Sequence, residues 1–415
     1  MNKIIYIISL FFSTLTFSQG NLIMGIIKDD KDNVPIESVS ISILGTNKGT
    51  VSNGDGRFRI FVPEGFFKIS FYHLGHEAKE YEIKGNEEVE IYLHPKEYVL
   101  NEVVINKNEG KEFLMQSIET SRNKIEKPVL LNTYYREFLK MDDNYTSFAD
   151  GLIDFHIRKL AKPKKKINKY LDFDLCVKQS RVFDLRTPSD KEAFEGRISM
   201  NIQGSTINFA YNNYISILLG VLKASQFYNF QMETKIENNG SNICVIHIDP
   251  KKEKGKDNIL AYYSGTVICD AEEKLILESD LNILPESVNK RINSKVIEFN
   301  KFLSQVKFKI VDGKYILSYL KTKCNVIWKK SVNDNESKHT TLEVVSYLTT
   351  LDYSEGEFKL PKIKKYEKQS LLLNGNSYTE EFWKNQNTVP LSEEEENIIK
   401  TLNQKSSSTA QDTIK

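Results

Sequence analysis

Residues 38–62 read SVSISILGTNKGTVSNGDGRFRIFV, and this stretch decides the fold of the first part of the chain. Apolar side chains alternate with polar ones on both sides of a glycine-rich middle. The apolar positions are Val39, Ile41 and Ile43 before the middle, and Phe58, Ile60 and Val62 after it. Alternation with period two predicts strands that have one buried face and one wet face. The middle is rich in Gly, Asn and Asp, which favour turns.

The same alternation extends to Leu93. It recurs at Phe67, Ile69 and Phe71, and again at Val89, Ile91 and Leu93. Short strands separated by closely spaced turn signals predict a β-sandwich over residues 21–95. We expect its core to contain Ile41, Phe58, Ile69 and Ile91.

These residues also resemble a known family, the carboxypeptidase-regulatory-like domain. The resemblance rests on Gly25–Asp29, Val34–Ile36, Val39–Ile41, Gly45–Thr50, Gly54–Phe58, Val62–Gly65, Leu74–Glu77 and Leu100–Ile105. It covers residues 21 to 105 and departs slightly at Val51-Ser52-Asn53. It implies a transthyretin-like sandwich of seven strands, which in that family is a non-catalytic accessory of peptidases, TonB-dependent receptors and uncharacterised surface proteins of outer-membrane bacteria.

The first residues are typical of a secretory signal. Lys3 supplies a positive charge, Ile4–Leu15 form an apolar run, and Thr16-Phe17-Ser18 offers small residues at a cleavage site. Residues 1–18 are therefore predicted to be a signal peptide, and the mature chain is expected to start near Gln19. The resulting location is outside the cytoplasm: periplasmic, associated with the outer membrane, or on the cell surface.

The remainder is predicted to be a second, larger region. Residues 96–127 are expected to form a linker and a helix, and residues 128–384 an antiparallel β-rich domain. The hairpin signals Asn239-Gly240 and Asp312-Gly313 indicate a meander of six or seven strands from about Gln231 onward. Because strands twist, such a sheet curves. The fold class is thus mainly β: an N-terminal seven-stranded β-sandwich followed by a larger α+β domain with a curved antiparallel β-meander.

Helices are predicted at three places in this second region. Glu112–Lys127 is followed by Pro128, which ends a helix. Tyr214–Ser225 is expected to be a helix that packs into the concave face of the sheet. In residues 385–415, Ser392 and Glu395 form a capping box for a short helix to about Leu402, and the tail after it is expected to be disordered.

Composition excludes some functions. Lys and Arg number 57 against 56 Asp and Glu, so the basic surface that nucleic-acid binders need is absent from the overall balance. The Lys162–Lys166 cluster is interpreted as a solvated loop. The four cysteines are widely spaced and form no CxxC motif. Each lies in an apolar stretch and is interpreted as a small buried side chain rather than as half of a disulfide: Cys176, Cys244, Cys269 and Cys324.

No catalytic, cofactor-binding or metal-binding residue is nominated. His94 and Glu97 match the HxxE spacing of zinc carboxypeptidases, but His94 ends the last predicted strand of the sandwich, so we interpret the match as chance. The close pair His73 and His76 has no acidic partner that the sequence places. In Tyr134-Tyr135-Arg136-Glu137, an Arg–Glu contact to a neighbour is favoured over ligand binding. A helix, a proline and such a strand in this order also resemble exported proteins that carry the same module.

The leading hypothesis is a non-enzymatic envelope or secreted protein that binds a protein, a glycan or the cell wall, with no cofactor and no nucleic acid. Peripheral association with the outer membrane is one arrangement that fits. One alternative is a carrier or sensor that holds an apolar ligand in the curved sheet. The other alternative is a hydrolase whose site carries no recognised motif. An apolar pocket would favour the carrier, and converging carboxylates or histidines would favour the hydrolase.

Overall fold

The computed structural model describes most of the chain after the predicted signal peptide. The described residues are 20–100, 109–125, 128–158, 172–187, 217–237, 242–251, 262–284, 297–311, 313–329, 339–356, 358, 371–373 and 375–412. The predicted signal peptide and the Lys162–Lys166 cluster lie outside them. Within them, no helix is both long enough and apolar enough to cross a membrane.

The chain divides into two compact units. The sandwich unit contains Met1–Pro95 and Glu380–Pro390, and the large-sheet unit contains Lys96–Thr379 and Leu391–Lys415. The segment 380–390 therefore belongs with residues that precede it by nearly 300 positions. We describe each unit by itself.

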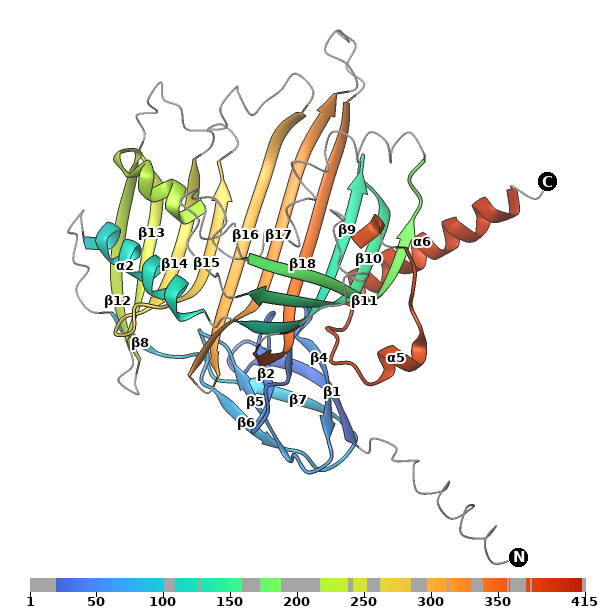
Figure 1. The fold of residues 1–415 in the computed structure, drawn as a ribbon, viewed down its shortest axis with the longest axis horizontal. Coiled ribbons are helices and arrows are strands. Elements are labelled where there is room, and N and C mark those ends of the chain that lie inside the picture. Colours follow the sequence, from blue (N-terminus) through green and yellow to red (C-terminus); the bar gives the residue numbers. More distant parts are fainter. Residues whose placement is uncertain are drawn as a thin grey trace, which may run out of the picture. The chain divides into compact units, whose positions relative to one another are not determined.

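The sandwich unit is built from seven strands in two sheets, drawn in blue in Figure 1. One sheet has the order β4-β1-β7 and the other has the order β3-β2-β5-β6. Strand β1 pairs antiparallel with β4 and parallel with β7. The strands are β1 (Gly20–Asp29), β2 (Ser40–Ile43), β3 (Gly49–Val51), β4 (Arg57–Pro63), β5 (Lys68–Tyr72), β6 (Lys79–Glu82) and β7 (Glu87–Leu93). The predicted seven-stranded sandwich is confirmed.

The core of this unit consists of the alternating apolar side chains that the sequence marked. Ile41 and Ile69 are fully buried, Phe58 is 1% exposed and Ile91 is 2% exposed, as predicted. Phe67 was wrongly grouped with them. It precedes β5, is 64% exposed, and so lies outside the alternation that a strand imposes.

The turn before β4 shows why glycine is required there. Gly56 has φ of +71°, and a Cβ atom at this position would lie 2.4 Å from the carbonyl oxygen of Ile27. The Ile27 amide in turn donates to the Gly56 carbonyl at 2.8 Å. Only glycine tolerates both the left-handed backbone and this close approach.

The C-terminal segment 380–390 packs against β4. It begins with the short helix α5 (Glu380–Lys384). The guanidinium of Arg59 donates to the carbonyls of Lys384 and, at 2.6 Å, Gln386. The amide of Phe61 donates to the Asn387 side chain at 2.7 Å. These contacts satisfy polar groups along the edge of β4 that does not pair with β1.

The large-sheet unit is one antiparallel sheet of eleven strands in the order β11-β10-β9-β18-β17-β16-β15-β14-β13-β12-β8. Seven strands, β12 to β18, follow each other in sequence and in space, which confirms the predicted meander. The strands are β8 (Tyr98–Leu100), β9 (Val129–Met141), β10 (Asn144–Arg158), β11 (Asp172–Asp184), β12 (Tyr228–Glu237), β13 (Asn242–Pro250), β14 (Tyr263–Asp270), β15 (Ile276–Ile283), β16 (Ile297–Val311), β17 (Lys314–Lys329) and β18 (His339–Glu355).

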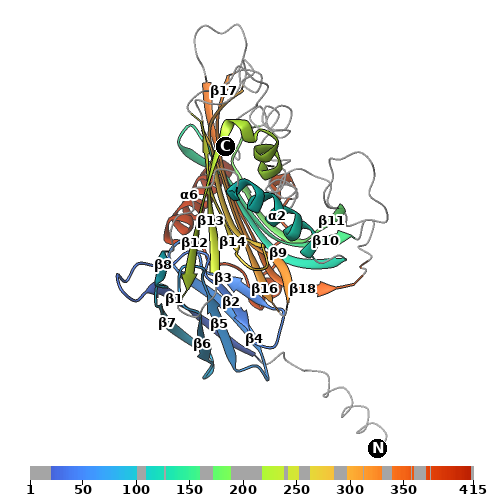
Figure 2. The same cartoon turned by 90° about the vertical axis from the view of Figure 1, so that its left-hand side faces the viewer.

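Helices lie on both faces of this sheet (Figure 2). They are α2 (Glu109–Lys124) and α6 (Glu393–Asp412), with short 3-10 turns at Ser225–Phe227 and Leu371–Leu373. Helix α2 packs with the described helical residues 217–223 on the face that holds the main apolar core. Helix α6 packs on the opposite face against a smaller apolar cluster that includes Phe138 and Phe148. The helix α6 continues to Asp412, ten residues beyond the predicted end at Leu402.

Strand β16 buries two of the three alternate apolar side chains near its end. Val306 and Phe308 are buried in the main core, but Ile310 is 43% exposed. It lies one residue before the end of the strand, next to the hairpin to β17, where the core no longer covers it.

Candidate functional site

The segment Tyr134–Glu137 of β9 is buried on both faces of the sheet. Residues 133–139 are all buried, in contrast to the alternating exposure of a strand with one wet face. Tyr135 belongs to the main core under α2, whereas Phe138 belongs to the cluster under α6. The charged side chains of this segment are therefore removed from water in either direction and need partners from the protein itself.

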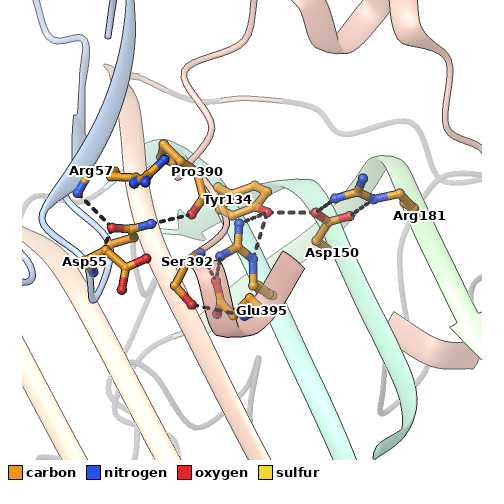
Figure 3. Close-up of polar contacts among 10 residues, drawn as sticks. Asp55, Arg57, Tyr134, Asp150, Arg181, Pro390, Ser392 and Glu395 are labelled. Atoms are coloured by element: carbon orange, nitrogen blue, oxygen red, sulfur yellow. Dashed lines mark hydrogen bonds and ion pairs between the residues drawn. The ribbon is translucent and has the colours of Figure 1, made fainter. Parts of the chain in front are cut away.

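Arg136 has its partners on the α6 side of the sheet, and two of them, Tyr134 and Glu395, are labelled in Figure 3. Arg136 is 3% exposed to solvent. One terminal nitrogen donates to the Glu395 carboxylate at 2.7 Å, and the other donates to the Tyr134 hydroxyl at 2.7 Å. The guanidinium also lies 5.2 Å from the centre of the Tyr134 ring. The predicted Arg–Glu contact is thus confirmed, and its partner is Glu395.

Asp150 on the neighbouring strand β10 continues this network. It is fully buried and pairs directly with Arg136 in the register of β9 and β10. Its carboxylate accepts from the Tyr134 hydroxyl at 2.8 Å and from two nitrogens of Arg181 at 2.6 and 3.1 Å. The result is a network of two ion pairs that are joined by the neutral Tyr134 hydroxyl, and its members in order are Arg181, Asp150, Tyr134, Arg136 and Glu395.

The electrostatics keep Tyr134, Arg136 and Arg181 in their ordinary charge states. Burial raises the pKa of the Tyr134 hydroxyl far above its usual value, so it stays protonated and donates to Asp150. Burial opposes the charge on Arg136, but Tyr134 and Glu395 raise the pKa of its guanidinium overall. The same balance, with Asp150 as the partner, raises the pKa of Arg181. No proton transfer near neutral pH follows from these directions.

Glu395 also holds the start of α6. The Ser392 amide donates to its carboxylate at 2.8 Å, and the Glu395 amide donates to the Ser392 hydroxyl at 3.2 Å. This is the predicted capping box, and it is confirmed. One carboxylate therefore caps the helix and binds Arg136, so the network fastens α6 to the sheet. The apolar contacts of Ile398, Ile399 and Leu402 complete the attachment.

On the other face of β9, Glu137 is 1% exposed within the main core. Its carboxylate accepts from the Tyr135 hydroxyl at 2.7 Å and from the Leu372 amide at 3.2 Å. Leu371 is fully buried in the same core. Glu137 thus anchors the short turn Leu371–Leu373 in the same way that Arg136 anchors α6.

The histidines that the sequence singled out lie in the sandwich unit. The Nδ1 atoms of His73 and His76 are 2.8 Å apart, and His76 Nε2 lies 3.0 Å from the carboxylate of Asp29. The acidic partner that the sequence did not place is therefore Asp29, on β1. His94 Nδ1 lies 2.8 Å from the Asp30 carboxylate, and that hydrogen bond raises the pKa of His94.

Metal-binding geometry does not arise from these histidines. Glu97, the second residue of the HxxE match, is exposed. Among the residues described by the structure, no group of three or more His, Cys, Asp or Glu side chains could hold a metal ion.

The concave-face helix that the sequence predicted is present over its described residues 217–223. Leu218 is fully buried, and Ile217 and Val221 are 8% and 2% exposed within the main core. These side chains occupy the face of the sheet where the carrier interpretation places an apolar ligand.

Comparison with known proteins finds similarity at the N-terminal part of the chain. Residues 23–105 match the family model of the CarboxypepD_reg-like domain, so this part of the chain is similar to that family. Two curated relatives also match part of the chain, and both are from Formosa agariphila. TonB-dependent receptor P39 is 30% identical over 103 residues, which are 24% of this chain and 10% of the receptor. TonB-dependent receptor P3 is 23% identical over 105 residues, which are 25% of this chain and 10% of the receptor. The match thus spans about a tenth of those relatives.

Solved structures give no comparable assignment for the large-sheet unit. Lipovitellin covers 61% of this chain and 28% of its own at 10% identity, with a TM-score of 0.26. A LolA superfamily protein from Nitrosomonas europaea covers 61% of this chain and 98% of its own at 12% identity, with a TM-score of 0.25. Scores this low establish no common fold.

The sequence pointed to Tyr134–Glu137 and to the Ser392–Glu395 capping box separately. It did not reveal that Arg136 and Glu395 bind each other, because 258 residues separate them. Asp150 and Arg181 carried no local signal, since a charged residue in an alternating strand normally faces water.

Proposed function

We propose that this protein works at the cell envelope as a non-enzymatic binding or structural protein. The sandwich unit would serve as an accessory module, and the large-sheet unit as the scaffold that presents or receives the partner. The partner would be an envelope protein, a glycan or the cell wall.

The observation that carries this proposal is the closed ionic network of β9, β10 and α6. It joins polar and charged residues from β9, β10, β11 and α6, and each charge has a partner in the same chain. A catalytic centre instead leaves a polar group directed at an open space where a substrate atom can sit. Arg136, at 3% exposure, and Asp150, fully buried, have no such access.

The proposed location draws on two further observations. The N-terminal sequence has the pattern of a signal peptide, with Lys3 followed by the apolar run Ile4–Leu15. The curated relatives that match part of the chain are named as TonB-dependent receptors. Both are consistent with an exported protein that is associated with the envelope.

Fractionation of the host cell tests the location. We expect the tagged chain in the envelope fraction, with a mature N-terminus near Gln19 by N-terminal sequencing. Ile8→Arg, which places a charge in the apolar run, should leave the full-length chain inside the cell. A wild-type chain that starts at Met1 and stays in the cytoplasmic fraction would overturn the proposal.

Binding and turnover are tested on the purified mature chain. We expect saturable co-sedimentation with outer-membrane vesicles or cell-wall sacculi, and no turnover of peptide, ester or glycoside substrates. Turnover of such a substrate would favour the hydrolase alternative over the binding role if a variant of one described polar residue abolished it. Circular dichroism of that variant has to show an intact fold.

A further inference from the structure

We propose that Cys244 and Cys269 form a disulfide bond that joins β13 to β14 when the chain folds under oxidising conditions. The two residues are direct partners in the antiparallel register of these strands. The structure holds them as free thiols. The inference concerns a covalent modification of the large-sheet unit, and it rests on the proposed export of the protein.

The backbone geometry brings the two residues within reach of each other. Directly opposed residues in an antiparallel pair have Cα atoms about 4.5 or 5.5 Å apart and point to the same face of the sheet. Disulfides span Cα separations of about 4.4–6.8 Å. In the structure the Cys244 sulfur lies 3.8 Å from the Thr234 hydroxyl, so a rotation about its Cα–Cβ bond turns it from β12 toward Cys269.

Neither of the other two cysteines lies opposite a cysteine in the described strand pairs. Cys176 on β11 is opposite Asp154, and Cys324 on β17 is opposite Phe302 and Val344. Strands β11 and β17 are not adjacent to each other or to β13 and β14. The fold therefore selects one pair out of the four cysteines.

The bond has to form before the core closes. Cys244 and Cys269 are 3% and 0% exposed. Burial raises the pKa of both thiols, to about 12 for Cys269, and the reactive species in exchange is the thiolate. After folding, little thiolate remains and no oxidant reaches it. During folding, both thiols are still accessible.

The chemistry is an ordinary thiol–disulfide exchange. The thiolate of one cysteine attacks the disulfide of an oxidant, either glutathione disulfide or a protein dithiol oxidant, and releases one thiol from it. The second cysteine then attacks the mixed disulfide and releases the other thiol. The chain loses two protons and two electrons, and the oxidant gains them as two thiols.

Refolding with glutathione disulfide tests the inference. The mature chain is refolded from denaturant with glutathione and excess glutathione disulfide, quenched with acid, denatured and alkylated without reduction. Peptide mass spectrometry should find Cys176 and Cys324 alkylated, and a linked peptide pair that contains Cys244 and Cys269, two hydrogens lighter than its reduced form. Alkylation of all four cysteines, or a different pairing, would overturn the inference.

Two variants serve as controls. Cys176→Ser with Cys324→Ser should leave the link unchanged, whereas Cys244→Ser should convert Cys269 into an alkylated thiol. The same mapping on protein from the host envelope reports on export separately. A link that forms on refolding but is missing from the host protein would count against the oxidising location in the proposed function and would leave the cysteine pair supported.

Discussion

Strands β4 and β9 illustrate two ways of burying a strand. In β4 (Arg57–Pro63) every second residue is buried, and the residues between are exposed or half-buried. In β9 (Val129–Met141) seven consecutive residues are buried. The first strand has a core on one face, whereas the second lies between the main core and helix α6. A covered second face requires partners for its polar side chains, and the ionic network supplies them.

The comparison shows where charge can be placed inside a β protein. Among the described residues of the sandwich unit, the buried side chains are apolar or uncharged polar ones such as Ser52 and Asn53, and none is charged. The core of this unit is stabilised by burial of apolar area, which is not directional. The contact between α6 and the sheet combines a small apolar cluster with a network of charges. Such a network specifies one position of the helix, because each charge needs its partner at hydrogen-bond distance.

Breaking the network should have the largest effect. Arg136→Ala removes the buried positive partner of the Glu395 carboxylate, and removal of one member of a buried pair costs about 3–5 kcal/mol. We expect this loss in the free energy of unfolding of the large-sheet unit, measured by urea denaturation. Amide hydrogen exchange should show faster exchange across α6 than across β16 and β17.

The double variant Arg136→Ala with Glu395→Ala tests whether the two residues stabilise the fold through their contact with each other or independently. It should lose less than the sum of the single variants, with a coupling of about 0.5–3 kcal/mol, since the two residues are in contact. Strict additivity would show that the network does not hold α6. Lys314→Ala is the matched control and should cost less than about 1 kcal/mol, because it removes an ion pair with Glu355 whose side chains are 30% and 52% exposed.

Truncation of the sandwich core should have the next largest effect. Ile41→Ala, Phe58→Ala, Ile69→Ala and Ile91→Ala should each cost about 2–5 kcal/mol in the stability of the sandwich unit. Met24→Ala is the control on an exposed position, because Met24 is 42% exposed and the change should stay within about 0.5 kcal/mol. Losses below about 1 kcal/mol for all four core variants would mean that the faces are inverted.

The smallest effect concerns His94. Its hydrogen bond to Asp30 raises the pKa above the ordinary value, so NMR titration of the imidazole should give a value higher than about 6.5, and Asp30→Asn should lower it. Because the folded-state pKa is raised, the pair stabilises the fold fully below the unfolded-state pKa. This contribution is lost as the pH rises through the folded-state value.

The same residue tests the interpretation of the HxxE match. His94→Ala should leave the metal content of the purified protein at background and its fold unchanged. Stoichiometric zinc in the wild-type protein that disappears in this variant would make His94 a metal ligand and contradict the interpretation of the match as chance.

Much of the architecture could be predicted because it depends on local patterns. The alternation around Ile41 and Phe58 predicted the sandwich strands and their buried faces. The turn signals Asn239-Gly240 and Asp312-Gly313 lie between strands that pair as hairpins, although Asn239, Gly240 and Asp312 themselves are outside the described residues. Helix α2 was displaced by three residues from its prediction, since helix ends depend on contacts beyond the local sequence.

The network could not be predicted to the same extent. The sequence predicted the capping box at Ser392 and an Arg–Glu contact of Arg136, because each depends on a spacing within a few residues. It gave no indication that β9 lies next to β18 or that α6 covers its outer face. Those neighbours come from distant parts of the chain, and only their contacts explain why Asp150 is fully buried.

By itself, therefore, the sequence determined the strands, turns and buried faces of the sandwich, the meander, and the cap of α6, since all of these depend on periodicity and short-range hydrogen bonds. The tertiary structure decided which charges are buried, which segment completes the sandwich unit and which two cysteines oppose each other. These features depend on strand order and on register between segments far apart in the chain. A one-residue slip in register would separate Cys244 from Cys269 and turn Arg136 away from Glu395, because side chains in a strand alternate between its two faces.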